Sequence, residues 1–135
     1  MIEQVIIAGF GGQGVMSMGQ LLAYSAMLED KNVSWLPSYG PEMRGGTANC
    51  NVIISDEAIG SPIVTEATAV IAMNLPSLDK FEHAVKPGGL LFINSSLIEK
   101  KSSRTDINVF YVPANAIADE LGNRRVANMV ILGAY

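Results

Sequence analysis

The first fifteen residues join an apolar, strand-like run to a glycine-rich turn. Residues 5–8 are all apolar, Gly9, Gly11 and Gly14 follow in the spacing Gly-x-Gly-x-x-Gly, and a helical pattern begins at Val15. Glycine allows positive φ in a tight turn, and it lets a phosphate approach the backbone amides without an intervening Cβ. Because the first amides of the next helix have no intrahelical partner, the turn predicts an anion-binding site after the first strand.

The residues after this turn argue against an ordinary NAD site. In dinucleotide-binding folds, an acidic residue about 20 positions further on holds the ribose hydroxyls at the end of the second strand. Here the second expected strand, residues 33–36, leads into the sequence PSY, while Asp30 precedes the strand and falls at its wrong end. In place of the acid comes a loop of glycines, prolines and hydroxyls with one arginine, PSYGPEMRGGT at residues 37–47.

Apolar runs alternate with helical patterns along the rest of the chain, which is typical of a layered α/β architecture. The continuous apolar runs suit strands that helices cover on both faces. We therefore expect a three-layer α/β/α fold with a mostly parallel, Rossmann-like central sheet. Further strands are predicted at residues 33–36, 47–55, 68–73, 90–93 and 109–112, and helices from Val15 onward, from a cap at Ser77 to about residue 84, over 115–121, and from 124 to the end.

Length and composition bound the number of domains and the class of partner. With 135 residues, 49% of them hydrophobic, the chain can form one core and is too short for two ordinary domains. A formal net charge of −4 disfavours nucleic acid as a partner. No apolar stretch approaches the roughly 18 to 20 residues of a membrane span, so we expect no membrane contact and a cytoplasmic location. The last helical pattern reaches Tyr135 without a stop signal, so residues 1–135 are expected to form one domain that ends inside its last helix.

The residue types that usually build metal or nucleophilic sites are scarce. Cys50 is the only cysteine and His83 the only histidine. A lone cysteine on a strand is more often a small buried hydrophobe than a reactive thiol, and His83 has no second ligand at helical spacing. We therefore expect no catalytic residue, no metal site and no internal disulfide in this chain.

Three segments carry a resemblance to a known family. They are GFGGQGV at residues 9–15, PSYGPEMRGGT at residues 37–47, and VANM at residues 126–129. In this order and over essentially the whole chain, they resemble the gamma subunit of the 2-oxoacid:ferredoxin oxidoreductases that act on pyruvate, 2-oxoglutarate or branched-chain 2-oxoacids. Related gamma-type domains occur in indolepyruvate:ferredoxin oxidoreductase and in single-chain pyruvate:ferredoxin oxidoreductase.

The resemblance implies a share in an enzyme assembly. The family reaction converts a 2-oxoacid and coenzyme A to acyl-CoA, carbon dioxide and reduced ferredoxin. The resemblance places thiamine diphosphate, magnesium and the iron–sulfur clusters on partner alpha, beta and ferredoxin-like delta subunits, with ferredoxin as electron acceptor. In agreement, Cys50 alone cannot hold a cluster, and the Gly-Asp-Gly signature that anchors magnesium and thiamine diphosphate does not occur here. The implied role of a gamma-type chain is to help enclose coenzyme A and to bridge the other subunits.

Candidate binding residues lie in the first two of these segments. We expect Arg44 to clamp a phosphate of coenzyme A, because a guanidinium matches phosphate geometry, or else to brace its own loop or pair with a sister subunit. Gln13 either reaches a ligand oxygen or braces the glycine turn against Asn49 or Asn51, and we favour bracing. Two other functions remain open, a structural bridge with an empty turn and a free-standing nucleotide-binding module. The full candidate set is Gly9, Gly11, Gly12, Gln13, Gly14, Ser38, Tyr39, Arg44 and Thr47.

Overall fold

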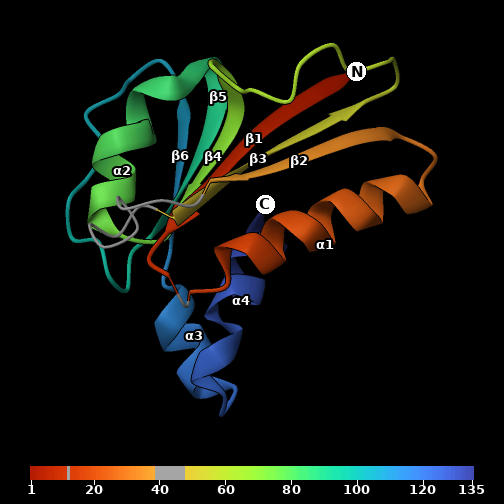
Figure 1. Ribbon diagram of the computed structural model, residues 1–135. Coiled ribbons are helices and arrows are strands. Elements are labelled where there is room, and N and C mark those ends of the chain that lie inside the picture. The colour runs from red at the N-terminus through yellow and green to blue at the C-terminus, as the bar shows by residue number, and fades with distance from the viewer. Residues whose placement is uncertain (12, 39–47) are drawn as a thin grey trace.

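The computed structural model describes residues 1–11, 13–38 and 48–135, and within them a single sheet is flanked by helices (Figure 1). The strands lie in the order β2-β3-β1-β4-β5-β6. No helix among the described residues is long and apolar enough to cross a membrane. The elements are β1 (Ile2–Gly9), α1 (Val15–Leu28), β2 (Asn32–Ser38), β3 (Ala48–Ser55), β4 (Ala67–Ala72), α2 (Leu75–Phe81), β5 (Val85–Asn94), β6 (Asn108–Val112), α3 (Ala114–Glu120) and α4 (Ala127–Ala134), with 3₁₀ turns η2 (Glu82–Ala84) and η3 (Arg124–Val126).

The expected three-layer architecture with a mostly parallel sheet is confirmed. Strands β1, β4, β5 and β6 pair in parallel, while β3 is antiparallel to both β1 and β2, so β3 alone of the described strands runs against the others. Helices α1 and α4 cover one face of the sheet and α2 covers the other (Figure 1). The insertion of β3 between β1 and β2 is not predictable from the apolar runs, which carry no information on strand direction.

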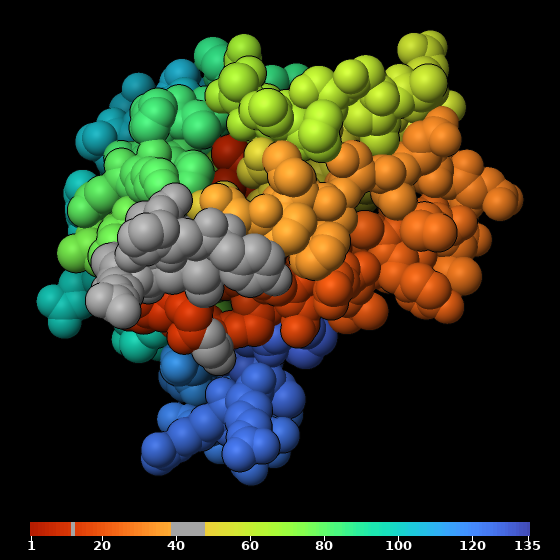
Figure 2. Space-filling model, in the orientation of Figure 1, coloured from red at the N-terminus to blue at the C-terminus, as the bar shows by residue number. Residues whose placement is uncertain are grey.

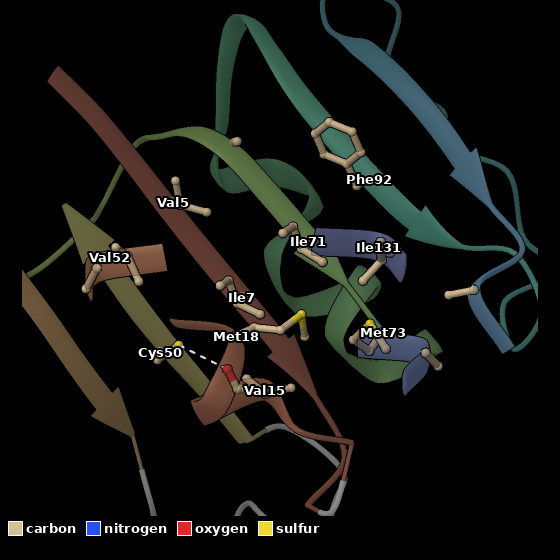
Figure 3. Close-up of a cluster of buried hydrophobic side chains, with 14 of the residues drawn as sticks. Val5, Ile7, Val15, Met18, Cys50, Val52, Ile71, Met73, Phe92 and Ile131 are labelled. Carbon is tan, nitrogen blue, oxygen red and sulfur yellow. Dashed lines mark hydrogen bonds between the residues drawn. The ribbon is translucent and has the colours of Figure 1, made fainter. Parts of the chain in front are cut away.

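Strand β1 is buried on both faces, which explains its uninterrupted apolar sequence. Val5 and Ile7 point into the cluster under α1 and α4, whereas Ile6 points into the cluster under α2, and each is 2% exposed or less. The first cluster also includes Ile71 of β4 and Ile131 of α4 (Figure 3). Full burial of such a side chain contributes about 1.5–3 kcal/mol. The central strand therefore ties both helical layers to one core.

Helix α1 approaches the sheet most closely at Gly19. A Cβ at this position would lie 2.5 Å from the Sγ of Cys50 and 2.8 Å from the Nε1 of Trp35. Cys50 itself is fully buried on β3, as expected from the sequence, and its thiol donates to the backbone oxygen of Val15 at 3.6 Å (Figure 3). The missing side chain of Gly19 thus sets how near the first helix lies to β2 and β3.

Local signals place most element ends, and the starts of α2 and β5 are among the differences from expectation. Helix α2 begins earlier than predicted, because Asn74 and not Ser77 is its N-cap, and the Ser77 amide donates to Asn74 Oδ1 at 2.9 Å. Pro76 has no amide hydrogen and fits the first turn without loss, which moves the cap upstream. Strand β5 begins at Val85 and not at residue 90, and it accommodates Gly88 at φ 82° through a shift in its pairing with β4.

The close approach at Gly19 gives a stability prediction. Gly19→Ala should lower the free energy of unfolding by about 1–3 kcal/mol, because overpacking against Cys50 and Trp35 outweighs the helical preference for alanine. Gly133→Ala on α4 is the matched control, since no atom lies within 4 Å of a Cβ built there. Urea denaturation followed by circular dichroism measures both. A Gly19→Ala variant as stable as the control would contradict this account of the packing.

The burial of Cys50 gives a prediction about its reactivity. Burial raises the pKa of the Cys50 thiol to about 11. At pH 8 only about one thiol in a thousand is then ionised, and the side chain is also shielded from reagent. We expect iodoacetamide to label Cys50 in urea but not in the folded chain at this pH. Rapid stoichiometric labelling of the folded chain, followed by mass spectrometry, would contradict the buried placement.

Candidate functional site

The carboxyl end of β1 lies at the point where the chain changes direction across the sheet. From β1 the chain proceeds through α1 to β2 on one side, whereas the parallel neighbour β4 lies on the other side. Met73, directly after β4, donates its amide to the Ala8 oxygen at 2.9 Å. In open α/β sheets, ligands bind in the crevice that forms at such a switch point. The glycine turn occupies this place.

Gln13 braces the turn, as we favoured from the sequence, although its partner differs from the expected ones. The side-chain Oε1 of Gln13 accepts a hydrogen bond from the backbone amide of Phe10 at 2.6 Å. The backbone amide of Gln13 donates to the Phe10 oxygen at 3.2 Å. Asn49 and Asn51 are not the partners of this bond. A Cβ on Gly9 would lie 2.7 Å from Gln13 Oε1 and 2.8 Å from Met73 Cβ. Glycine at position 9 is therefore required for the braced turn to fit against β4.

Gly14 caps α1 and contacts the C-terminal helix. It has φ 75°, in the region that favours glycine, and a Cβ there would collide with the side chain of Asn128. Asn128 Nδ2 donates to the Gly14 oxygen at 3.4 Å. Gly14, the N-cap residue, makes no side-chain hydrogen bond to the amides in the first turn of α1. These amides are consequently oriented as an anion site requires, and Asn128 of the VANM segment belongs to the same place.

A pocket of about 160 Å³ opens beside the turn. Asn115 lines this pocket, and its Oδ1 accepts a hydrogen bond from Asn94 Nδ2 at 2.8 Å. This bond fixes the orientation of the Asn115 amide, because Oδ1 faces Asn94 and Nδ2 points away from it. Asn94 is buried at the end of β5, and its own Oδ1 accepts from the Ala114 amide at 3.2 Å. The pocket is lined by Gln13, Met73, Asn115, Arg124, Arg125, Ala127 and Asn128.

Two arginines of this lining were missed by the sequence analysis. Gly122, at φ 81°, ends α3 as expected, and the Asn123 amide donates to the Ala118 oxygen at 3.1 Å, which turns the chain back. Figure 2 shows the resulting C-terminal segment, in blue, below the red-to-orange region where α1 begins. The only sign in the sequence is that two arginines, Arg124 and Arg125, are adjacent. The fold is needed to show that α3 and η3 bring them back to the glycine turn at residues 9–14.

The second candidate segment begins and ends at the same edge of the sheet. Ala48 is the register partner of Gly9, and Ser38 is the partner of Asn49, so the end of β2 and the start of β3 both lie level with the glycine turn. Of the predicted site residues, Gly9, Gly11, Gln13, Gly14 and Ser38 are thus at this edge. Gly12, Tyr39, Arg44 and Thr47 lie outside the described residues.

Burial shifts the pKa of the Cys50 thiol, whereas the described carboxyl groups with shifted pKa values lie in surface ion pairs. Lys31 lowers the pKa of Asp56, and Arg104 lowers that of Asp106, through hydrogen-bonded ion pairs at the protein surface. Within residues 1–11, 13–38 and 48–135, no group of three or more His, Cys, Asp or Glu side chains could hold a metal ion. The described lining of the pocket consists of amide, guanidinium and apolar side chains.

Comparison with known sequences identifies relatives along the whole chain. The family described as pyruvate ferredoxin/flavodoxin oxidoreductase matches residues 4–135. The ketoisovalerate oxidoreductase subunit VorA of Methanothermobacter marburgensis is 46% identical over 130 residues, which are 96% of this chain and 27% of VorA. The 2-oxoglutarate synthase subunit KorC of Methanocaldococcus jannaschii is 35% identical over 99% of this chain and 73% of KorC. The chain thus spans about a quarter of the VorA relative and about three quarters of KorC.

Solved structures give the same assignment. The gamma subunit of the keto/oxoacid ferredoxin oxidoreductase from Geobacter sulfurreducens has a TM-score of 0.83 and 31% identity, over 98% of this chain and 74% of that subunit. The 2-oxoglutarate:ferredoxin oxidoreductase of Magnetococcus marinus has a TM-score of 0.88, over 98% of this chain and 23% of that chain. Its sequence identity is 23%, so this second comparison shows the shared fold alone. The resemblance noted in the sequence is confirmed: this chain belongs to the pyruvate ferredoxin/flavodoxin oxidoreductase family.

Proposed function

We propose that this chain is the gamma-type part of a 2-oxoacid:ferredoxin oxidoreductase that converts a 2-oxoacid and coenzyme A to acyl-CoA, carbon dioxide and reduced ferredoxin. The observation that carries the proposal is the pocket at the switch point of the sheet, bounded by the glycine turn and by arginines. Family membership supplies the reaction class. Thiamine diphosphate, magnesium and iron–sulfur clusters belong, in this proposal, to the partner alpha, beta and delta subunits, where they supply the decarboxylation and the electron transfer.

The ligand proposed for the pocket edge is coenzyme A. It carries a diphosphate and a 3′-phosphate, and the uncapped amides at the start of α1 suit such an anion. The segment at residues 39–47 connects strand ends that lie level with this turn. We assign Arg44 to a phosphate of coenzyme A, with the neutral donors Ser38, Tyr39 and Thr47 beside it.

Binding of this kind contributes to the reaction without a catalytic group on the chain. Interactions with the remote phosphates of coenzyme A position its thiol, which reacts at a centre held by other subunits. The roles of the turn follow from its geometry: Gly9 and Gly14 admit the close packing, and Gln13 keeps the turn in shape. Gly11 and Gly12 of the glycine motif are further candidates for phosphate approach.

An exposed apolar stripe on α1 supports the second half of the proposal, a bridge to other subunits. Leu21, Tyr24 and Leu28 follow one another at helical spacing and are 43%, 58% and 68% exposed, and Met27 beside them is 56% exposed. Contiguous apolar surface of this kind marks protein interfaces, where tyrosine and methionine are enriched. We assign this stripe to contact with a partner subunit.

The coenzyme A assignment predicts a selective binding defect. Arg44→Ala in the purified native assembly should raise the KM for coenzyme A about 10- to 100-fold and leave kcat unchanged, because loss of one charge-assisted hydrogen bond weakens binding by about 1.5–3 kcal/mol. Lys86→Gln, at the opposite end of the sheet, is the control for loss of one positive charge. An unchanged KM in a normally assembled Arg44→Ala complex would refute the clamp.

The stripe on α1 predicts a defect in assembly. The double substitution Tyr24→Asp and Leu28→Asp should reduce co-purification of the partner subunits at least tenfold, because two charges would have to be buried at the interface. Ile63→Asp is the matched control, since Ile63 is 60% exposed on the loop between β3 and β4. Quantitative size-exclusion chromatography measures the outcome. Full assembly of the double variant would exclude this face of α1 as the bridge.

A further inference from the structure

The pocket has a basic wall that the glycine turn does not account for. Arg124 and Arg125 line it from η3, and they follow the turn by more than a hundred residues in the sequence. The chain as a whole carries a formal net charge of −4. Among the described lining residues none is acidic, and the others are amides or apolar side chains. Positive charge is thus concentrated at a crevice of an otherwise acidic chain.

The backbone that carries these arginines is well ordered by local interactions. Gly122 and Asn123 close the end of α3 with two backbone hydrogen bonds, from Gly122 to the Asp119 oxygen at 3.0 Å and from Asn123 to the Ala118 oxygen at 3.1 Å. The side chain of Asn123 then accepts from the Arg125 amide at 3.0 Å. This pair of caps fixes the direction in which η3 leaves α3. The arginines are therefore held at the pocket by a defined turn.

The two arginines differ in their charge partners. Arg124 Nε lies 3.2 Å from Asp119 Oδ1, so part of its charge is compensated by α3. Arg125 has no ion pair with any residue in the described part of the chain, and its side chain is exposed at the pocket. An uncompensated guanidinium offers a planar fork that matches a phosphate oxygen pair. The amide donors of Asn115 and Asn128 lie in the same lining.

We propose that Arg125, with Arg124 beside it, binds a phosphate group of the ligand that enters this pocket. The identity of that ligand, coenzyme A, rests on the proposed function, whereas the phosphate chemistry rests on the pocket itself. The phosphate would be held by the guanidinium of Arg125 and by the side-chain amides of Asn115 and Asn128, which line the same pocket. Arg125 and Arg44 belong to different segments of the sequence, so the two proposed contacts can be tested independently.

The test uses the purified native assembly with Arg125→Gln, Arg125→Lys and the control Lys86→Gln. Arg125→Gln should raise the KM for coenzyme A about tenfold and leave kcat unchanged. In about 0.5 M salt the KM values of the variant and the unsubstituted assembly should lie closer together, because salt screens an exposed charge pair. Arg125→Lys should show a smaller rise, since it keeps the charge and loses the fork. Lys86→Gln should leave the KM unaltered.

A second substrate distinguishes the phosphate that is bound. With 3′-dephospho-coenzyme A, disappearance of the difference between Arg125→Gln and the unsubstituted assembly assigns the 3′-phosphate to Arg125. Persistence of the difference assigns the diphosphate, and either result supports the subsite. A KM for coenzyme A that Arg125→Gln leaves unchanged overturns the subsite, as does a loss confined to kcat. If Arg125→Gln leaves the KM unchanged but Arg44→Ala raises it, only the Arg125 subsite fails. If neither variant changes the KM, the coenzyme A site is refuted as well.

Discussion

The burial of β1 on both faces is the constraint on which the rest of the structure depends. Val5 and Ile7 anchor the layer of α1 and α4, and Ile6 anchors the layer of α2, so this strand cannot slip by one residue without exchanging its two faces. Its pairing with β3 on one side and β4 on the other fixes where it ends. The glycine turn therefore lies at the switch point of the sheet, and the pocket opens beside it, at the carboxyl end of β1.

Much of the fold follows from local patterns in the sequence. The apolar runs indicate the strands, and the Gly-x-Gly-x-x-Gly spacing indicates the turn that leads into α1, because both signals act over a few neighbouring residues. Strand direction does not follow in this way: β3 lies between β1 and β2 because long-range pairing places it there. Likewise Asn74 and not Ser77 caps α2, since Pro76 between them changes which residue can begin the helix.

The site was predictable only where its residues are close in sequence. The turn at residues 9–14 carries its own motif, and Gln13 braces it through Phe10, three residues away. Arg124 and Arg125 belong to the same pocket through the return of α3 and η3, and no periodicity in residues 113–126 announces that return. Arg124 and Arg125 lie near Gln13 because of tertiary packing, and a single sequence gives no sign of such packing.

The hydrogen bond from Asn128 to Gly14 joins positions 114 residues apart. A contact between positions so far apart in the sequence forms only when a long loop of chain has closed. The crevice therefore lacks one wall until the segment from α3 to α4 has packed against the glycine turn, because Asn115, Arg124, Arg125 and Asn128 all belong to that segment.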